Sequence, residues 1–290
     1  MNRKSLFKNS RYLLLVLPLF LLIVFFEIIP LFGILIKGFL KENTHNFSFE
    51  NFVNIFTSEY YMMSIKNSLY VALLSAFIGI ILAYICSHAI YKARKSLWAK
   101  RFVDVLNITS NFQGIQLAFA FIIILGNSGT FVLLGKKFGI NFLLNFDLYT
   151  SFGIMLTYIF FQIPLGSLLL YPSFKLVKDE YMEAASLMNA AGAKFWRYIG
   201  IPILLPNILG TFSVLFANAL AAYATPYALM GNNYALLPIK ISTMFTGDIV
   251  QQKELGSALS AVMIGLIVLV TVICNKAITY EIEGEDADEN

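Results

Sequence analysis

One short stretch of this chain places closely spaced polar side chains just before a long apolar run. Residues 104–116 read DVLNITSNFQGIQ. Amides and hydroxyls donate and accept hydrogen bonds, but they are weak bases and nucleophiles. This composition therefore favours binding or passing a polar molecule, or hydrogen bonding between helices, over making or breaking bonds. On a helix, two faces would carry these groups: Asn107, Asn111 and Gly114 on one, and Thr109, Gln113 and Gln116 on the other.

Motifs that would let the chain catalyse a reaction by itself are missing from the sequence. The string nearest to a phosphate-binding loop runs from Gly129 to Lys137, with five residues between its glycines instead of four. Lys137 stands where such a loop needs a Ser or Thr to hold Mg²⁺. The sequence thus predicts no enzyme, no metal site and no cofactor bound by this chain. Four residues of metal-ligating type lack partners at ligand spacing: Cys86, Cys274, His45 and His88.

The elements that must position the polar residues are membrane helices. The 290-residue chain is 58% hydrophobic and 13% charged, against roughly 45–50% and 25% in an average soluble domain. Its mean hydropathy is +0.73, and the apolar residues gather in runs near the ~20 residues that cross a ~30 Å hydrocarbon core. We expect an all-α membrane protein with one transmembrane domain, residues 1–280. Its six predicted transmembrane helices cover residues 12–36, 66–90, 102–126, 148–171, 201–230 and 256–279.

The basic residues predict how these helices are oriented. Of the 21 lysines and arginines, 14 lie in the N-terminal segment, in 91–101, in 172–200 and at Lys276, and 7 lie in the intervening segments. The positive-inside rule then places both termini and the 172–200 loop in the cytoplasm. Because six of the 17 acidic residues fall in the last ten positions, residues 281–290 are expected to form a disordered acidic tail. The basic residues behind the net charge of +4 therefore indicate membrane topology. They give no sign of nucleic-acid binding.

Two predicted helices carry residues that disturb a regular span. Pro18 and Pro30 can bend the first helix, and we expect the fifth helix to break at Pro226. Glu27 is an ionisable group within the first helix. It marks either a functional site or a carboxylate that snorkels or pairs near the outer leaflet.

Polar residues inside the spans are candidates for a path through the membrane. Such groups must face other helices or water, since exposure to lipid is costly. Hydrogen bonding between helices without solute contact is therefore the alternative. Asp104, in contrast, is expected to pair with Arg101 one turn earlier. The path candidates are Asn107, Asn111, Gln113, Gln162, Asn218 and Tyr223.

The loop between the fourth and fifth helices is the most distinctive part of the chain. Residues 172–206 read PSFKLVKDEYMEAASLMNAAGAKFWRYIGIPILLP. Helical spacing runs from about Phe174 to Met188, a turn follows, and a second short helix runs up to Pro202. The central alanines permit another backbone to approach closely, and Leu187 and Met188 could insert into a groove. The alternative is a solvated amphipathic connector.

This loop resembles the EAA motif of the permeases of binding-protein-dependent ABC importers. The family pattern is EAA, three residues, Gly, nine residues, and Ile-x-Leu-Pro. Here Glu183-Ala184-Ala185 is followed in register by Ile199 and Pro202. The resemblance implies that residues 174–200 form a coupling helix seated in a cleft of an ATPase subunit.

The motif's glycine falls on Asn189, and a glycine follows only at Gly192. Asn is the next-best residue to Gly for a left-handed turn, so the motif's geometry can survive. The residues that the resemblance assigns to coupling with the ATPase are Glu183, Ala184, Ala185, Leu187, Met188, Asn189 and Gly192.

Other segments are similar to the polyamine-type branch of this family, which also holds permeases for iron, phosphonate and thiamine. Residues 47–74 resemble the lead into the second helix, including Asn51-Phe52 and Asn67-Ser68-Leu69. Thr225-Pro226 and Gly256-Ser257-Ala258 carry the match in the later part of the chain.

The resemblance implies an ATP-driven importer in the bacterial cytoplasmic membrane. ATP and Mg²⁺ would be bound by a dimer of cytoplasmic ATPase subunits. A second homologous permease, or a second copy of this chain, would complete the translocation path. An extracytoplasmic binding protein would deliver a small hydrophilic solute such as a polyamine, a phosphonate or iron. Closure of the ATPase would switch the path between inward-facing and outward-facing states.

Two alternatives stay open from the sequence. One is an ABC permease for a different solute class, such as sugar or sulfate. The other is an ATP-independent channel or secondary transporter, which would need charged or broken helices with internal repeats. Helices interrupted by proline are present, but the two halves of the chain show no convincing repeat.

Overall fold

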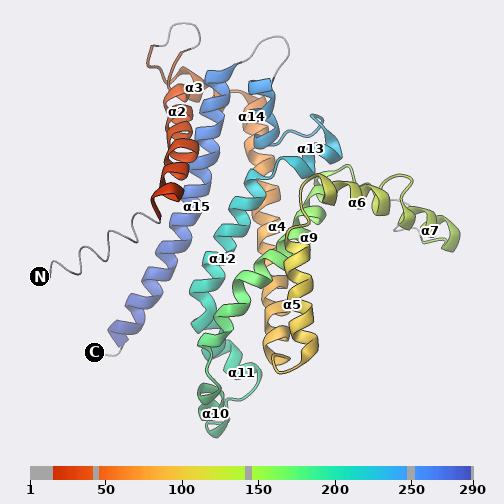
Figure 1. The fold of residues 1–290 in the computed structure, drawn as a ribbon, viewed down its shortest axis with the longest axis vertical. Coiled ribbons are helices and arrows are strands. Elements are labelled where there is room, and N and C mark those ends of the chain that lie inside the picture. The colour runs from red at the N-terminus through yellow and green to blue at the C-terminus, as the bar shows by residue number, and fades with distance from the viewer. Residues whose placement is uncertain (1–15, 42–45, 141–145, 247–251, 289–290) are drawn as a thin grey trace, which may run out of the picture. The chain divides into compact units, whose positions relative to one another are not determined.

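The described part of the chain is built from helices (Figure 1). The computed structural model describes residues 16–41, 46–140, 146–246 and 252–288. Within these ranges there is no strand, only an isolated bridge between Leu40 and Phe47, and the all-α prediction is confirmed. Residues 12–15 of the first predicted helix, the N-terminal basic residues and His45 lie outside the described residues.

Six helical segments are long and apolar enough to cross a membrane. The predicted number of spans is therefore confirmed, and all except the third overlap their predicted positions closely. The six segments are Val16–Gly38, Glu59–Lys92, Ile115–Phe138, Ser151–Leu176, Ala193–Ala221 and Lys253–Ile278.

The third predicted helix, residues 102–126, is wrong as a single element. The structure instead has α5 (Leu97–Ser110), a non-helical segment at residues 111–114, α6 (Ile115–Leu125) and α7 (Thr130–Phe138). The apolar run long enough to cross a membrane consists of α6 and α7 together.

The interruption between α5 and α6 has a local cause. Near the end of α5 the amides of Asn107 and Asn111 donate to the carbonyls of Val103 and Asn107, so they bond to their own helix. Such side chains compete with the helical backbone for its hydrogen-bonding groups. Gly114 then takes a φ of 75°, a conformation that residues with a Cβ rarely adopt. Together these residues end α5 and turn the chain.

The fifth predicted helix breaks as expected, but not at Pro226. α12 (Ile201–Ala221) and α13 (Ala224–Met230) are separated by two residues, Ala222 and Tyr223. Pro226 lies in the first turn of α13, where backbone amides have no acceptor within the helix and a proline costs little. The break therefore falls upstream of the proline.

Each of two prolines near a helix start is preceded by a single turn of π-helix. The turn η1 (Val24–Ile28) precedes Pro30, and η3 (Trp196–Gly200) precedes Pro202. A proline within a continuing helix lacks an N–H and its ring clashes with the carbonyl four residues earlier, and a widened turn relieves both problems. Pro30, one of the two prolines that could bend the first helix, thus directly follows a π-helical turn. This turn contains Glu27, whose side chain is exposed.

The helices fall into two compact units, which we describe separately. The first contains Met1–Met62 and Ile241–Ile264, and the second contains Met63–Lys240 and Gly265–Asn290. In the first unit, α2 (Ile29–Gly38) meets the early part of α15 (Lys253–Asp288). A Cβ on Gly38 would lie 3.0 Å from the Cα of Ala258, so the absence of a side chain permits this close approach.

A short helix, α3 (Glu50–Thr57), follows in the first unit. The side-chain amide of Asn51 donates to the carbonyls of Gly38 at 3.1 Å and Leu40 at 2.9 Å. Carbonyls at the end of a helix have no partner within it. Asn51 therefore provides hydrogen-bond donors to carbonyls at the end of α2. One of the residues that carry the family resemblance thus has a structural role.

In the second unit, α9 (Ser151–Leu170) packs against both α5 and α12, and α4 (Glu59–Lys92) runs beside this group (Figure 1). Small residues let the helices approach: a Cβ on Gly166 of α9 would lie 2.8 Å from the Cβ of Ala83 on α4. The helices α6 and α7 turn away from the group (Figure 1).

Two neighbouring residues of α4 bind a distant segment of the same unit. The amide of Asn67 donates to the carbonyl of Ala235 at 3.1 Å, and the hydroxyl of Ser68 accepts from the N–H of Leu237 at 2.8 Å. Leu237 is the first residue of α14 (Leu237–Thr246). The Asn67-Ser68 pair thus fixes the beginning of α14 on α4.

The acidic tail differs from its prediction. α15 continues as a helix to Asp288, so residues 281–288 are helical instead of disordered. Extending an existing helix needs no new nucleus, and the glutamates and the alanine of this segment have good helix propensity.

Candidate functional site

The loop that carries the EAA resemblance forms a helical hairpin at one end of the second unit (Figure 1). It begins with η2 (Tyr171–Leu176), a 3₁₀ turn, and continues with α10 (Asp179–Leu187). After a turn, α11 (Ala193–Phe195) leads through η3 into α12. We name residues 171–200 the hairpin. The predicted helix–turn–helix is present, with its first helix divided between η2 and α10.

The turn of the hairpin depends on left-handed backbone. Asn189 has a φ of 57°, and it is the single non-glycine residue with positive φ in the described part of the chain. Gly192 has a φ of 67°. Asn tolerates this region because its short side chain can hydrogen-bond locally. In backbone geometry, Asn189 therefore replaces the motif's glycine, as predicted.

The tip of the hairpin presents apolar side chains to the outside. Leu187 and Met188 are 90% and 81% exposed, and Glu183 and Ala184 are exposed beside them. Large apolar side chains grouped on a polar surface typically mark a docking site. Ala185 is buried instead, so it packs inside the hairpin.

A cluster of aromatic residues fixes the hairpin to the ends of α4 and α12. Phe174 and Phe195 are buried together with Tyr91 of α4 and Leu204 of α12. The ring of Trp196 lies 4.2 Å from that of His88 on α4. His88, which lacks partners at metal-ligand spacing in the sequence, thus contributes to this attachment through its ring.

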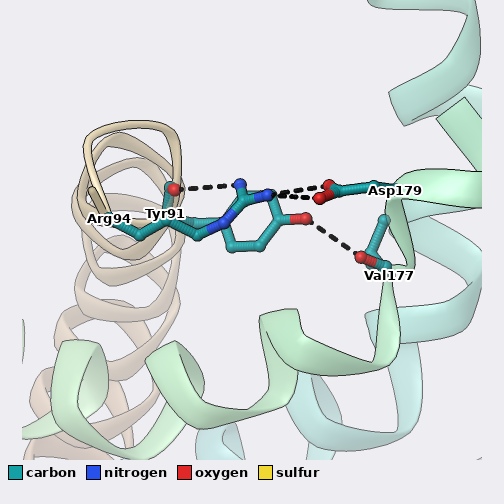
Figure 2. A network of polar contacts seen from close by, with 4 residues as sticks. All are labelled: Tyr91, Arg94, Val177 and Asp179. Atoms are coloured by element: carbon teal, nitrogen blue, oxygen red, sulfur yellow. Dashed lines mark hydrogen bonds and ion pairs between the residues drawn. The ribbon is translucent and has the colours of Figure 1, made fainter.

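An ion pair adds a second attachment, which we name the Arg94 clamp (Figure 2). Arg94 follows the end of α4 and donates from Nη2 to both carboxylate oxygens of Asp179, at 2.7 and 2.8 Å. Its Nη1 donates to the carbonyl of Tyr91 at 3.3 Å, and the guanidinium carbon lies 4.3 Å from the centre of the Tyr91 ring. The Tyr91 hydroxyl donates to the carbonyl of Val177 at 2.9 Å.

The Arg94 clamp holds the point at which α10 begins. Asp179 is the first residue of α10, and a carboxylate is favourable there because the helix dipole is positive at its N-terminus. From the sequence alone, Arg94 is one of several basic residues in 91–101 that indicate topology. Its pairing cannot be predicted from the sequence, because Asp179 lies 85 residues away and no local pattern connects the two.

A second candidate region lies where two helix interruptions meet. The hydroxyl of Thr225 in α13 donates to the carbonyl of Gly114, between α5 and α6, at 3.1 Å. The hydroxyl of Tyr158 in α9 donates to the carbonyl of Ala222, between α12 and α13, at 3.2 Å. Non-helical backbone at membrane depth is tolerated where protein covers it or water reaches it. Such a place suits the passage of a hydrophilic solute.

The structure divides the predicted path residues by their exposure. Asn107, Asn111 and Gln113 are exposed at or next to the first interruption. Tyr223 lies in the second interruption, 36% exposed and stacked on Tyr227 with the ring centres 5.0 Å apart. Thr225 and Tyr227 complete this region, although the sequence did not single them out as path residues.

Two of the predicted path residues are less accessible. Gln162 is completely buried and donates to the hydroxyl of Ser75 on α4 at 3.2 Å, which is a hydrogen bond between helices. Asn218 on α12 is partly buried.

The pairing expected between Arg101 and Asp104 does not form. The ion pairs found in the described ranges are Lys41–Glu50 and Arg94–Asp179. Arg101 instead lies over the ring of Trp98, with its guanidinium carbon 5.6 Å from the ring centre. Among the same residues, no three His, Cys, Asp or Glu side chains are placed to hold a metal ion.

Proteins similar in sequence are permeases of transport systems. The chain is 25% identical over 212 residues to a probable sulfate transport system permease protein cysT of Helicosporidium sp. subsp. Simulium jonesii, and the match covers 72% of each chain. Two relatives are from Haemophilus influenzae. The thiamine transport system permease protein ThiP is 26% identical over 61% of this chain and 32% of its own length. The putative ferric transport system permease protein FbpB 1 is 27% identical over 84% of this chain and 38% of its own length. The chain thus spans about a third of these two relatives.

Solved structures share the fold of this chain at low sequence identity. A chain of a bacterial ABC transporter involved in the import of the acidic polysaccharide alginate superposes with a TM-score of 0.73, at 15% identity, over 94% of this chain and 96% of that one. A chain of the MetNI methionine ABC transporter superposes with a TM-score of 0.57, at 14% identity, over 78% of this chain and 99% of that one. No protein-family model matches the chain. In sequence, fold and its six apolar helices, the chain is similar to the membrane-spanning permease subunits of ABC importers.

Proposed function

We propose that this chain forms one half of the translocation path of an ATP-driven importer and that the hairpin couples the path to ATP hydrolysis. The observation that carries the proposal is the hairpin itself. It combines the EAA register with an exposed apolar tip, Leu187 and Met188, and with a firm attachment to membrane helices.

The partner proposed for the hairpin is a cytoplasmic ATPase subunit, which binds the ATP and Mg²⁺. Glu183 offers a carboxylate to a basic group of the partner, and Leu187 and Met188 fill an apolar cleft. The Arg94 clamp joins the hairpin to α4, and the continuous run through η3 joins it to α12. A displacement of the hairpin therefore acts on two membrane helices at once.

The other proposed partners are a second permease subunit, either homologous or a second copy, and an extracytoplasmic binding protein. The alginate transporter has been solved in complex with a periplasmic protein bound to an alginate pentasaccharide, which supports the binding-protein partner. In a bacterial cytoplasmic membrane, the excess of basic residues would place both termini and the hairpin on the cytoplasmic side.

The solute is proposed to be small and hydrophilic. The relatives are named for sulfate, thiamine and ferric transport, and the exposed path candidates are amides and a phenol that can hydrogen-bond to such molecules. In this proposal Asn107, Asn111, Gln113 and Tyr223 face the solute, whereas Gln162 and Asn218 shape the helices around it.

The test is to purify the tagged chain from its host in mild detergent and to identify what accompanies it by mass spectrometry. We expect an ATPase subunit to co-purify with the wild type and to be lost with Glu183→Lys. Glu59→Lys is the matched control, since Glu59 is an exposed glutamate at the first residue of α4 and lies outside the hairpin.

A co-purifying second permease would establish which pair forms the path. If the chain instead purifies alone and carries solute into liposomes without ATP, the coupling proposal fails. A channel or secondary transporter would then be the better description.

A further inference from the structure

A groove between α4 and α5 has no role in the proposed transport cycle. Its cavity volume is about 500 Å³, within the roughly 300–1,000 Å³ typical of pockets that hold small molecules. One side includes two small residues, Ala89 of α4 and Ala93 just after its end. The α5 side carries larger ones, including Trp98, Phe102 and Val105.

The groove is open on the outer surface of the second unit. Trp98, Phe102 and Val105 are 76%, 46% and 50% exposed. Its floor is closed, because Ile90 of α4 and Ala99 of α5 are buried in one apolar cluster. In a chain that crosses a membrane, an outward apolar groove of this kind meets lipid tails unless another protein covers it.

The lining of the groove includes a positive charge without a carboxylate partner. Arg101 lines the groove and lies over the Trp98 ring at 5.6 Å. Asp104, one turn further along α5, forms no ion pair with it, and the ion pairs in the described ranges involve other residues. An apolar groove lined by a guanidinium that has no carboxylate partner is complementary to an amphiphile with a single anionic head.

We propose that this groove binds one anionic phospholipid, with an acyl chain lying between α4 and α5 and its phosphate at Arg101. Tryptophan and arginine are both favourable at the level of the lipid headgroups. The surrounding segment 91–101 holds five basic residues, which suits the anionic surface of the cytoplasmic leaflet. The site itself requires only that the chain spans a membrane, and the assignment to this leaflet rests on the proposed orientation.

The experiment measures lipid retention by the whole complex purified with its partners. The complex is reconstituted in nanodiscs of phosphatidylcholine with a minor share of phosphatidylglycerol, extracted gently, and examined by native mass spectrometry. We expect Arg101→Gln to lower the retention of phosphatidylglycerol about fivefold, the effect of one interfacial charge. Lys100→Gln is the matched control: it removes an exposed neighbouring charge that does not line the groove, and retention should be unchanged.

A second variant tests the acyl part of the site. Ala89→Phe fills the groove from an exposed position of α4 and should lower the retention of both phospholipids, while the thermal unfolding of the complex stays near that of the wild type. A photoactivatable phosphatidylglycerol should label peptides of α4 and α5 in the wild type and not in Ala89→Phe. Both readouts are independent of ATP and of solute uptake, so their failure is distinguishable from failure of the coupling proposal.

Three results would overturn the lipid site. Equal losses of phosphatidylglycerol retention with Arg101→Gln and Lys100→Gln would show that retention depends on general surface charge and not on a site at Arg101. Displacement of the lipid by glycerol 3-phosphate at equal concentration would show that a free phosphate ester is recognised without its chains. Cross-linking of Phe102→Cys to another permease subunit, with no lipid label in α4 or α5, would show that a protein covers the groove.

Discussion

The guanidinium of Arg94 joins the carbonyl and the ring of Tyr91, three residues earlier, to the carboxylate of Asp179, 85 residues later. Its side chain is one-third exposed and that of Asp179 is 62% exposed, so solvent screens the pair. Exposed pairs of this kind stabilise a protein by about 1 kcal/mol at most. We therefore expect the Arg94 clamp to orient α10 more than to stabilise the fold.

We expect Arg94→Gln to lower ATP-driven uptake about tenfold, within the usual range of coupling between sites, while ATP hydrolysis continues. The melting temperature should fall by no more than about 4 °C. Both can be measured on the complex in proteoliposomes. The double exchange Arg94→Asp with Asp179→Arg should recover part of the uptake. A large loss of melting temperature that parallels the loss of uptake would contradict a positioning role.

Asn189 offers a second test at this scale, since its φ of 57° is left-handed. Asn189→Gly should retain binding of the ATPase subunit, because glycine adopts this backbone freely. Asn189→Val should weaken binding about tenfold, since left-handed backbone costs a residue with a Cβ roughly 1–2 kcal/mol. Titration of the ATPase subunit onto the permease in nanodiscs measures both. Equal affinities for the two variants would show that the turn does not shape the docking surface.

At the scale of elements, η3 is where the hairpin becomes α12, and its geometry depends on Gly200. A Cβ on Gly200 would lie 2.5 Å from a ring carbon of Trp196, and that ring also packs on His88. We expect Gly200→Ala to destabilise the protein by about 1–3 kcal/mol through overpacking and to reduce coupling, as measured by thermal unfolding and uptake.

Gly210 provides the control for that substitution. It lies in α12 as well, and a Cβ there would have no neighbour within 4 Å. Gly210→Ala should be neutral or should stabilise the protein by about 0.5–1 kcal/mol, because glycine is unfavourable within a helix. If both alanine variants behave alike, the contact between Gly200 and Trp196 has no special importance.

The elements also show which features a sequence can predict. Long apolar runs are local, and hydropathy therefore places most of the membrane helices correctly. The helix interruptions have partners from other elements: the hydroxyl of Tyr158 donates to the carbonyl of Ala222, and the hydroxyl of Thr225 donates to that of Gly114. No pattern along the chain reveals those bonds. The position of a proline alone consequently does not locate a helix break: Pro226 lies within α13, downstream of the break.

The candidate site divides in the same way. The EAA register and the turn at Asn189 are local in sequence and could be predicted from it. The burial of Ala185 and Gln162 and the pairing of Arg94 depend on packing, so they could not. Whether a polar residue in a span faces a solute or another helix is likewise decided by its neighbours, and Gln162 and Asn111 differ for that reason.

At the scale of the whole molecule, the proposed orientation predicts which surfaces face each side of the membrane. With Cys86 and Cys274 replaced by alanine, Leu187→Cys should react with a membrane-impermeant maleimide in inside-out vesicles and not in intact cells. Phe138→Cys, at the exposed end of α7, should show the opposite pattern. The reverse result for both positions would invert the topology and remove the hairpin from the reach of a cytoplasmic ATPase.

The bonds from Asn67 and Ser68 to Ala235 and Leu237 also bear on how the protein is made. These partners follow 168 and 169 residues later in the chain, and ribosomes add roughly 5–20 residues per second. For roughly ten to thirty seconds, a newly inserted α4 holds an amide and a hydroxyl whose final partners do not yet exist. Nascent chains that stop before residue 235 would keep these groups unsatisfied, and we expect membrane quality-control proteases to remove them faster than full-length chains.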